Sequence, residues 1–184
     1  IPVLADGAQS VGAVPTTAEG VDFLTVSGQK WLCGPDSTGA LVIADPERLR
    51  LVSPSFLAQR GYEPDGAYEP TPGARRFEPG WWSQGTLRGL LAALELRPAW
   101  WHERAVAAAE RCRELLGPLV ELVVPETPST LVAFRVEDDP VAVVARLHEA
   151  DVHVREIPGR GLVRVSCGWW TSDEDLERLG RALG

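Results

Sequence analysis

Three short apolar runs open the chain, and each lies between glycine, proline, serine or acidic residues. They occupy residues 1–5, 21–26 and 39–44. A short apolar run bounded by turn residues predicts a strand. The first run is uninterrupted and ends at Asp6, which is typical of a parallel strand buried on both faces. After the third run, Asp45 and Pro46 form a capping signal and predict a short helical turn.

A helical pattern extends from about residue 83 to residue 116. Leucines recur in its first part at steps of three and four residues, namely Leu87, Leu90, Leu91 and Leu94. This period indicates an amphipathic helix. Pro98 interrupts the pattern, and a proline inside a helix removes a hydrogen bond, so we expect a kink or two helices. Gly117 and Pro118 form a stop signal.

The remaining residues alternate between strand-like and helix-like segments. Strands are predicted at residues 119–124, 130–136, 152–157 and 162–166. Asp139 and Ser172 are predicted helix caps, and acidic residues follow Ser172 in the first turn, where they suit the helix dipole. The pattern predicts a small α+β domain with an antiparallel sheet covered by helices. Residues 53–79 are rich in proline and glycine, so we expect a loop without regular structure there.

The composition narrows the classes of function. The net charge of −8 and the pI of about 4.9 argue against a nucleic-acid binder, which would present a basic surface. No apolar run approaches the length of a membrane span, and no signal peptide is recognisable. The three cysteines are widely separated, so they predict neither a metal site nor a disulfide framework. We therefore expect a cytoplasmic protein.

The chain contains a single lysine, Lys30, among many arginines. A lysine can give up its proton and attack a carbonyl, whereas an arginine guanidinium stays protonated. Further polar residues follow the first two predicted strands: Asp6, Gln9, Ser27 and Gln29. Because ligands of open α/β sheets bind outside the carboxyl ends of the strands, we expect these side chains to share a site with Lys30.

Pyridoxal phosphate is a cofactor that requires such a set of side chains. Its aldehyde forms a Schiff base with a lysine, and an aspartate keeps its ring nitrogen protonated by charge pairing. A glutamine amide can donate a hydrogen bond to the ring oxygen. Hydroxyl and backbone donors can bind the phosphate. The stretch at residues 3–35 therefore predicts a pyridoxal phosphate site.

This stretch resembles the cofactor-binding core of the class V aminotransferase family of fold-type I pyridoxal phosphate enzymes. The family includes cysteine desulfurases, selenocysteine lyases, kynureninases and isopenicillin epimerase-like proteins. The matching residues are Asp6, Ala8, Gln9, Gly12, Pro15, Asp22, Phe23, Ser27, Gln29, Lys30, Gly34, Pro35 and Gly39. Gln29 stands where many members have a histidine, although its amide can still donate to a phosphate.

The resemblance implies a role for each residue of this core. Lys30 would carry the Schiff base, Asp6 would pair with the ring nitrogen and Gln9 would bond the ring oxygen. Ser27 and Gln29 would face the phosphate. The simpler alternative makes Asp6 a helix cap and Lys30 a solvated surface residue, but it leaves the agreement of five residues with the family's spacing unexplained.

Two further parts of the site are implied by the same resemblance. Trp81 stands where the family has a threonine that reaches the phosphate of the neighbouring subunit's cofactor; Thr86 or Ser83 is a candidate to replace it. Arg164 lies where the family has the arginine that binds the substrate's α-carboxylate, and its planar guanidinium suits that group. Arg155 is a weaker candidate for this role, and an ordinary surface arginine is the alternative.

The resemblance also implies an α/β fold. Residues 1–96 would be the C-terminal part of the cofactor-binding large domain, with a mostly parallel sheet. Residues 97–118 would form a connecting helix, and residues 119–184 a small α+β C-terminal domain. Because the chain starts inside a predicted strand and family members are longer, we expect a C-terminal portion of a longer protein. The remainder would hold the glycine-rich phosphate turn and the residue that stacks on the ring.

These observations predict a pyridoxal phosphate-dependent enzyme, an aminotransferase of class V, that acts on an amino acid or amine through Lys30. A homodimer is implied by the resemblance. The sequence does not separate transamination, elimination and epimerisation. One alternative is a cysteine desulfurase or C–S lyase-like activity, although residues 158–161 lack the nucleophilic cysteine that sulfur transfer to the protein requires. The other is a non-catalytic α/β member of the family.

Overall fold

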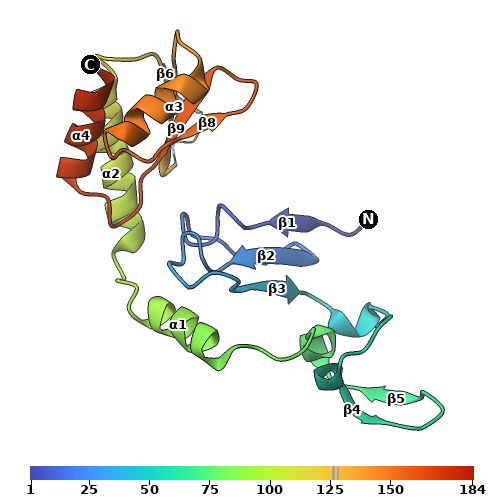
Figure 1. Ribbon diagram of the computed structural model, residues 1–184. Coiled ribbons are helices and arrows are strands. Elements are labelled where there is room, and N and C mark those ends of the chain that lie inside the picture. Colours follow the sequence, from blue (N-terminus) through green and yellow to red (C-terminus); the bar gives the residue numbers. More distant parts are fainter. Residues whose placement is uncertain (126, 128) are drawn as a thin grey trace. The chain divides into compact units, whose positions relative to one another are not determined.

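The computed structural model describes residues 1–125, 127 and 129–184 of the chain (Figure 1). It divides into two compact units, Ile1–Arg97 and Pro98–Gly184. We describe each unit by itself. Their assignment to the large and small domains of a longer enzyme stays a prediction.

The first unit is organised around a three-stranded sheet. Its strands are β1 (Leu4–Asp6), β2 (Phe23–Ser27) and β3 (Gly39–Ile43), in that order across the sheet. β1 pairs with β2 in parallel and β2 pairs with β3 antiparallel. All three strands fall on the apolar runs of the sequence, so this part of the prediction is confirmed. Figure 1 shows them side by side.

The expectation of a mostly parallel sheet is wrong for the described residues. Among the named strands only β1 and β2 pair in parallel, and every other strand pair is antiparallel. A parallel connection needs a crossover, usually a helix, whereas residues 28–38 form turns that lead β3 back alongside β2. β1 is also not buried on both faces, because Leu4 is 60% exposed.

The proline-rich segment at residues 53–79 is more regular than the sequence suggested. It contains a hairpin of β4 (Gln59–Tyr62) and β5 (Tyr68–Pro70), with short 3₁₀ helices at Phe56–Ala58 and Gly73–Phe77. The hairpin turn contains Asp65, whose carboxylate accepts a hydrogen bond from the Ala67 N–H at 2.9 Å, and Gly66 at φ +90°. An Asp-Gly pair between strands is a known hairpin signal, so this hairpin could have been predicted from the sequence.

Helix α1 (Gln84–Glu95) completes the first unit. The Ser83 hydroxyl caps its start by accepting a hydrogen bond from the Thr86 N–H at 3.3 Å. No residue of α1 is buried, and Leu91 is 55% exposed. Another short 3₁₀ helix, Pro46–Arg48, follows β3, but Asp45 makes no side-chain cap there, contrary to the prediction.

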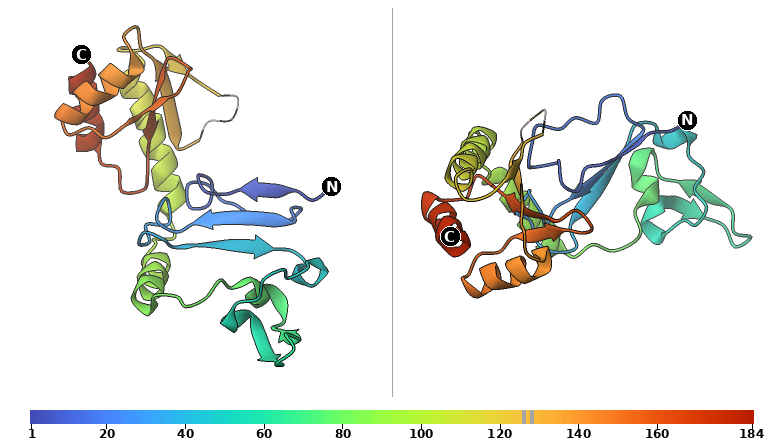
Figure 2. Two further views of the ribbon diagram at one scale, coloured as in Figure 1. Left: turned by 45° about the vertical axis from the view of Figure 1, so that its right-hand side comes forward. Right: turned by 90° about the horizontal axis from the view of Figure 1, so that it is seen from above.

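The second unit is an antiparallel sheet with helices on one face (Figures 1 and 2). The strands β6 (Leu122–Val123), β7 (Leu131–Arg135), β9 (Leu162–Ser166) and β8 (Arg155–Ile157) lie in that order. The helices are α2 (Trp101–Leu116), α3 (Pro140–Glu149) and α4 (Asp173–Leu183). The break between α1 and α2 confirms the interruption predicted at Pro98. The α+β prediction for residues 119–184 agrees with these elements.

The core of the second unit follows from strand alternation. Val132 and Phe134 of β7 and Val163 and Val165 of β9 are buried, while the residues between them are more exposed. Alternate residues of a strand point to opposite faces, so these four share the face that the helices cover. α4 begins with a reciprocal capping box between Ser172 and Asp175, as the sequence indicated for Ser172.

Candidate active site

The carboxyl end of β1 positions Asp6. In the parallel register, Asp6 lies opposite Thr25 of β2, and the Thr25 hydroxyl donates a hydrogen bond to Asp6 Oδ1 at 3.0 Å. The Ala8 N–H donates to the same oxygen at 2.9 Å. The Gly7 N–H donates to Thr25 Oγ1 at 3.1 Å, so one threonine orders both the carboxylate and the turn behind it. No described residue donates a hydrogen bond to Asp6 Oδ2.

Gly7 is required by this close strand approach. A Cβ on Gly7 would lie 2.3 Å from the backbone oxygen of Thr25, which is far inside van der Waals contact. Only a residue without a side chain lets the chain turn here against β2. The position of Asp6 therefore depends on its glycine neighbour.

The Asp6 carboxyl group is held in its ionised form. Its pKa lies below the ordinary value, first because of the hydrogen bond from the Ala8 backbone and then because of that from Thr25. The positive charge of Lys30 lowers this pKa further, while partial desolvation opposes the shift. An ionised carboxylate is the form that can pair with a protonated ring nitrogen.

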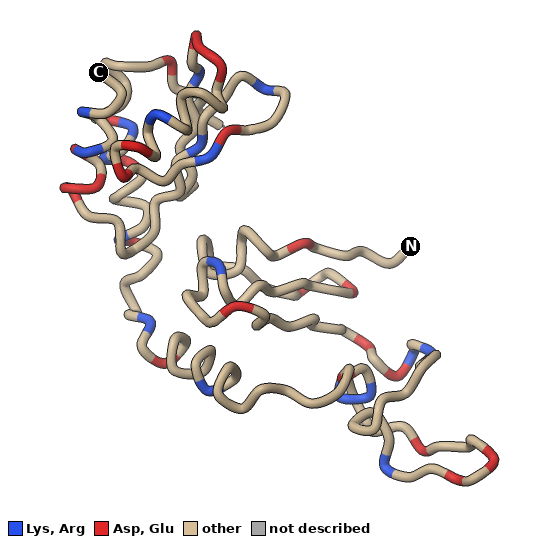
Figure 3. Tube along the Cα trace, in the orientation of Figure 1, with Lys and Arg blue, Asp and Glu red and all other residues tan. Residues whose placement is uncertain are grey.

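Lys30 projects from the turn that follows β2. The turn is closed by hydrogen bonds from the Cys33 N–H to the Lys30 carbonyl at 2.9 Å and from the Gly34 N–H to the Gly28 carbonyl at 2.8 Å. Trp31 and Leu32 are buried, whereas Lys30 is exposed. The two apolar neighbours thus anchor the turn and leave the amine at its surface. Lys30 is also the only basic residue within residues 1–44, a single blue segment in that part of Figure 3.

Residues 28–34, which we call the lysine turn, pack closely against α1. A Cβ on Gly34 would come within 2.6 Å of the Leu90 Cδ1 atom, and one on Gly28 within 2.3 Å of the Thr38 hydroxyl. Both glycines therefore allow the turn to approach the helix and the start of β3. The helical leucine pattern of the sequence contributes one side chain, Leu90, to holding this turn.

Gln9 is oriented by a residue of the lysine turn. The indole N–H of Trp31 donates a hydrogen bond to Gln9 Oε1 at 3.0 Å. The oxygen of the amide is thereby used inside the protein, and its NH₂ group remains as the donor. This is the group that the predicted contact with a ring oxygen needs. Trp31 could not be identified in this role from the sequence, because the bond spans 22 positions.

The remaining predicted residues of the first unit have different settings. Ser27 ends β2 opposite Gly39 and is half-buried. Gln29 is exposed beside Lys30. Thr86 lies in the first turn of α1, where its backbone N–H is used by the Ser83 cap. The charge of Lys30 contributes to the lowered pKa of Asp6. The places of Ser27, Gln29 and Thr86 in a site, like that of Lys30, stay predictions.

Arg164 belongs to the second unit. It lies on β9 between the buried Val163 and Val165, so its side chain is on the sheet face away from the core. Its Nε is buried and has no hydrogen-bond partner among the described residues. Arg155 of β8 lies directly opposite, and no described acidic side chain pairs with either arginine. Two facing cations without an acid make a surface suited to an anion.

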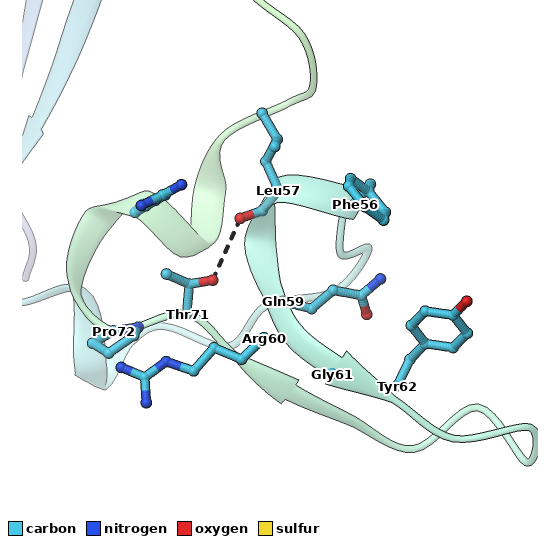
Figure 4. Close-up of a pocket in the computed structure, with 9 residues that line it drawn as sticks. Phe56, Leu57, Gln59, Arg60, Gly61, Tyr62, Thr71 and Pro72 are labelled. Atoms are coloured by element: carbon cyan, nitrogen blue, oxygen red, sulfur yellow. Dashed lines mark hydrogen bonds between the residues drawn. The ribbon is translucent and has the colours of Figure 1, made fainter.

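A cavity of about 740 Å³ lies elsewhere in the first unit, around the hairpin of β4 and β5. In Figure 4 the side chains of Gln59 and Tyr62 point to the same side, while Arg60 extends in the opposite direction. The irregular register between Gln59 and Gly61 accounts for this arrangement. None of the predicted cofactor residues lines the cavity. We therefore assign the candidate site by its chemistry at the strand ends rather than by the size of this cavity.

The chain belongs to the class-V aminotransferase family, whose profile matches residues 1–179. It is 28% identical to isopenicillin N epimerase of Streptomyces clavuligerus over 213 residues, which cover 100% of this chain and 52% of that protein. No helix of the described residues is long and apolar enough to cross a membrane.

Two solved structures are similar over nearly the whole chain. A mutant of C-DES, with glycine covalently linked to its pyridoxal phosphate cofactor, has a TM-score of 0.84 and 28% identity over 99% of this chain and 51% of that chain. The cysteine desulfurase of Thermococcus onnurineus has a TM-score of 0.84 and 24% identity over 97% of this chain and 50% of that chain, which supports the fold. The chain thus spans about half the length of these relatives.

The residues present fit pyridoxal phosphate, the cofactor that this family uses. Asp6 is ionised with one oxygen uncommitted, Gln9 offers an amide donor, and Lys30 is an exposed amine in the same unit. Thr25 and Trp31 were not identified from the sequence as parts of this arrangement. They act by orienting Asp6 and Gln9 across the strand and turn.

Proposed function

We propose that the chain forms part of a pyridoxal phosphate-dependent enzyme that acts on an amino acid or amine. The observation that carries this proposal is the Asp6 carboxylate, held ionised in the same unit as the only lysine. Membership of the class-V family supports it.

Each residue of the strand ends has a task in this proposal. When bound, the cofactor supplies an aldehyde that condenses with amines and a ring that withdraws electrons from the substrate. The Lys30 Nζ atom would hold the aldehyde, and its free amine would take the proton from the substrate's Cα. Asp6 would pair with the ring nitrogen, and the Gln9 NH₂ would donate to the ring oxygen. Ser27, Gln29 and Thr86 are the candidate phosphate contacts.

Arg164 is the proposed ligand for the substrate's carboxylate. Its buried Nε lacks a partner among the described residues, and a buried donor without a partner is costly. A carboxylate that accepts from this guanidinium would remove the cost. Substrates without a carboxylate should therefore bind more weakly than amino acids.

A C–S lyase-type reaction is the second candidate. It is favoured by the similarity to C-DES, one of whose structures is described as that of a cystine C–S lyase with its product cysteine persulfide, at 27% identity. Residues 158–161 contain no cysteine, so transfer of sulfur to a cysteine of that loop has no support. A non-catalytic α/β member of the family is the remaining alternative.

Cofactor labelling tests the proposal directly. The chain, and the same chain extended to the length of its relatives, are mixed with pyridoxal phosphate, reduced with borohydride and mapped by mass spectrometry. In this chain we expect one modified side chain, at Lys30, because the N-terminal amine is its only other primary amine, and in the extended chain we expect an adduct on the peptide that contains Lys30. Lys30→Arg keeps the charge but lacks a reactive amine, so it should abolish side-chain labelling and turnover. Normal turnover of this variant, or no Lys30 adduct in the extended chain, would overturn the proposal.

A further inference from the structure

The second unit holds a pair of histidines with facing ring nitrogens. His148 lies in the last turn of α3, and His153 follows a tight turn after that helix. Their Nδ1 atoms are 3.0 Å apart, and the ring planes are inclined at 76°. The turn between them is made by Asp151 at φ +58°, a left-handed conformation that aspartate tolerates. Both rings are exposed to solvent.

Asp151 orients the second ring of the pair. Its Oδ1 lies 3.4 Å from His153 Nε2, and its Oδ2 accepts from the Arg178 guanidinium at 3.1 Å. When Nε2 of His153 carries the proton and donates to Asp151, its Nδ1 presents a lone pair towards His148. A carboxylate behind an imidazole is the usual way in which proteins orient a histidine that binds a metal.

We propose that His148 and His153 form a site for a divalent transition-metal ion, such as Ni²⁺ or Cu²⁺. Two imidazole nitrogens bound about 2.05 Å from one ion at a right angle lie about 2.9 Å apart. The observed 3.0 Å is close to this separation. His148 gives up its Nδ1 proton to solvent and takes one on Nε2, so both rings bind in the neutral form. The carbonyl end of α3 adds a favourable potential for a cation.

The site is an open one. The described residues contain no group of three or more histidine, cysteine or acidic side chains that could hold one metal ion. Water would therefore fill the remaining coordination positions of an ion bound by the two histidines. Arg178 lies beyond Asp151 and weakens the attraction for a cation. Imidazole ligands with open positions favour Cu²⁺ and Ni²⁺, and Cu²⁺ is the tightest divalent binder of its row. The ion would clamp the end of α3 to the segment that enters β8.

Calorimetric titration of the tag-free chain with NiCl₂ tests the proposal. We expect one equivalent to bind, with affinity reduced at least tenfold in His148→Ala and in His153→Ala. His102→Ala is the matched control, because His102 is the only other histidine and lies on α2. It should bind nickel as the unchanged chain does.

A further variant separates the effect of the Asp151 carboxylate on metal binding from its effect on the backbone of the turn. Asp151→Asn keeps a residue that tolerates the left-handed backbone but removes the charge, so we expect a loss of about tenfold or more. Unchanged affinity in the two single alanine variants would overturn the proposal. So would the absence of nickel and copper binding by a folded chain, which would leave the pair as a hydrogen bond between two rings.

Discussion

The two units differ in how they bury their apolar residues. In the second unit Phe134 and Leu147 have no exposed surface, and they belong to one continuous core. In the first unit Leu4, Leu41 and Leu91 are 60%, 48% and 55% exposed. The first unit has strands of similar length but no comparable core.

The candidate residues are divided between these two units. Asp6, Gln9 and Lys30 belong to the first unit, and their geometry depends on local hydrogen bonds and glycine contacts. Arg164, the proposed carboxylate ligand, belongs to the second unit, in a sheet that its own helices support. We therefore expect the two units to respond differently to substitution.

The largest contrast should come from truncating a buried side chain. Phe134→Ala removes a ring that is fully enclosed by the second unit, and should lower the free energy of unfolding by about 3–5 kcal/mol. Leu41→Ala, the control in the first unit, should change it by less than about 0.5 kcal/mol. Urea denaturation followed by circular dichroism measures both. Equal losses in the two variants would contradict the contrast.

A cap substitution tests the second unit at a smaller scale. The Ser172 hydroxyl accepts a hydrogen bond from the Asp175 N–H at 3.1 Å, and the Ser172 N–H donates one to Asp175 Oδ2 at 2.9 Å. Ser172→Ala should cost about 1 kcal/mol of stability, whereas Ser172→Gly should cost only about a few tenths. The same urea titration measures the difference. Identical values for the two variants would argue that the cap does not limit the stability of α4.

The smallest effect concerns the Asp6 carboxyl group. Thr25→Val removes the second largest cause of its lowered pKa, so that pKa should rise but stay below the ordinary value while the Ala8 bond remains. A carboxyl group with a lowered pKa stabilises the fold at pH values above its ordinary pKa. This contribution is lost as the pH falls through the folded-state pKa. The variant should lose less of this contribution on acidification. Carbon-13 titration of Asp6 measures the shift, and Thr25→Ser, which keeps the hydroxyl, should leave it unchanged.

Much of the fold could be predicted from the sequence because local signals agreed with tertiary packing. The runs that became β2 and β9, the interruption at Pro98 and the cap at Ser172 were all evident in the sequence. The direction of strand pairing was not, because it depends on whether a connection contains a crossover. The exposure of β1 could not be predicted either. An apolar run favours burial, but it does not show whether a neighbouring layer of protein covers the strand.

The candidate site was predictable to a similar degree. Asp6 and Lys30 were identified from their residue types and their positions after strands. Thr25 and Trp31 were not, because a threonine in a strand and a tryptophan in a turn are ordinary residues until the register brings them to their partners. Cys33 is exposed, at φ +57° in the tight lysine turn. Its pKa is raised, chiefly by desolvation of the thiol and despite the charge of Arg97.

The tight fit at Gly7 bears on how mutational libraries of this protein should be interpreted. Any side chain at that position collides with the Thr25 backbone and displaces the neighbouring Asp6. A selection for activity would thus rank position 7 among the least tolerant, next to Asp6, although glycine takes no part in the chemistry. If the proposed function holds, scoring abundance and activity in parallel should assign the intolerance of position 7 to folding and that of Lys30 to function.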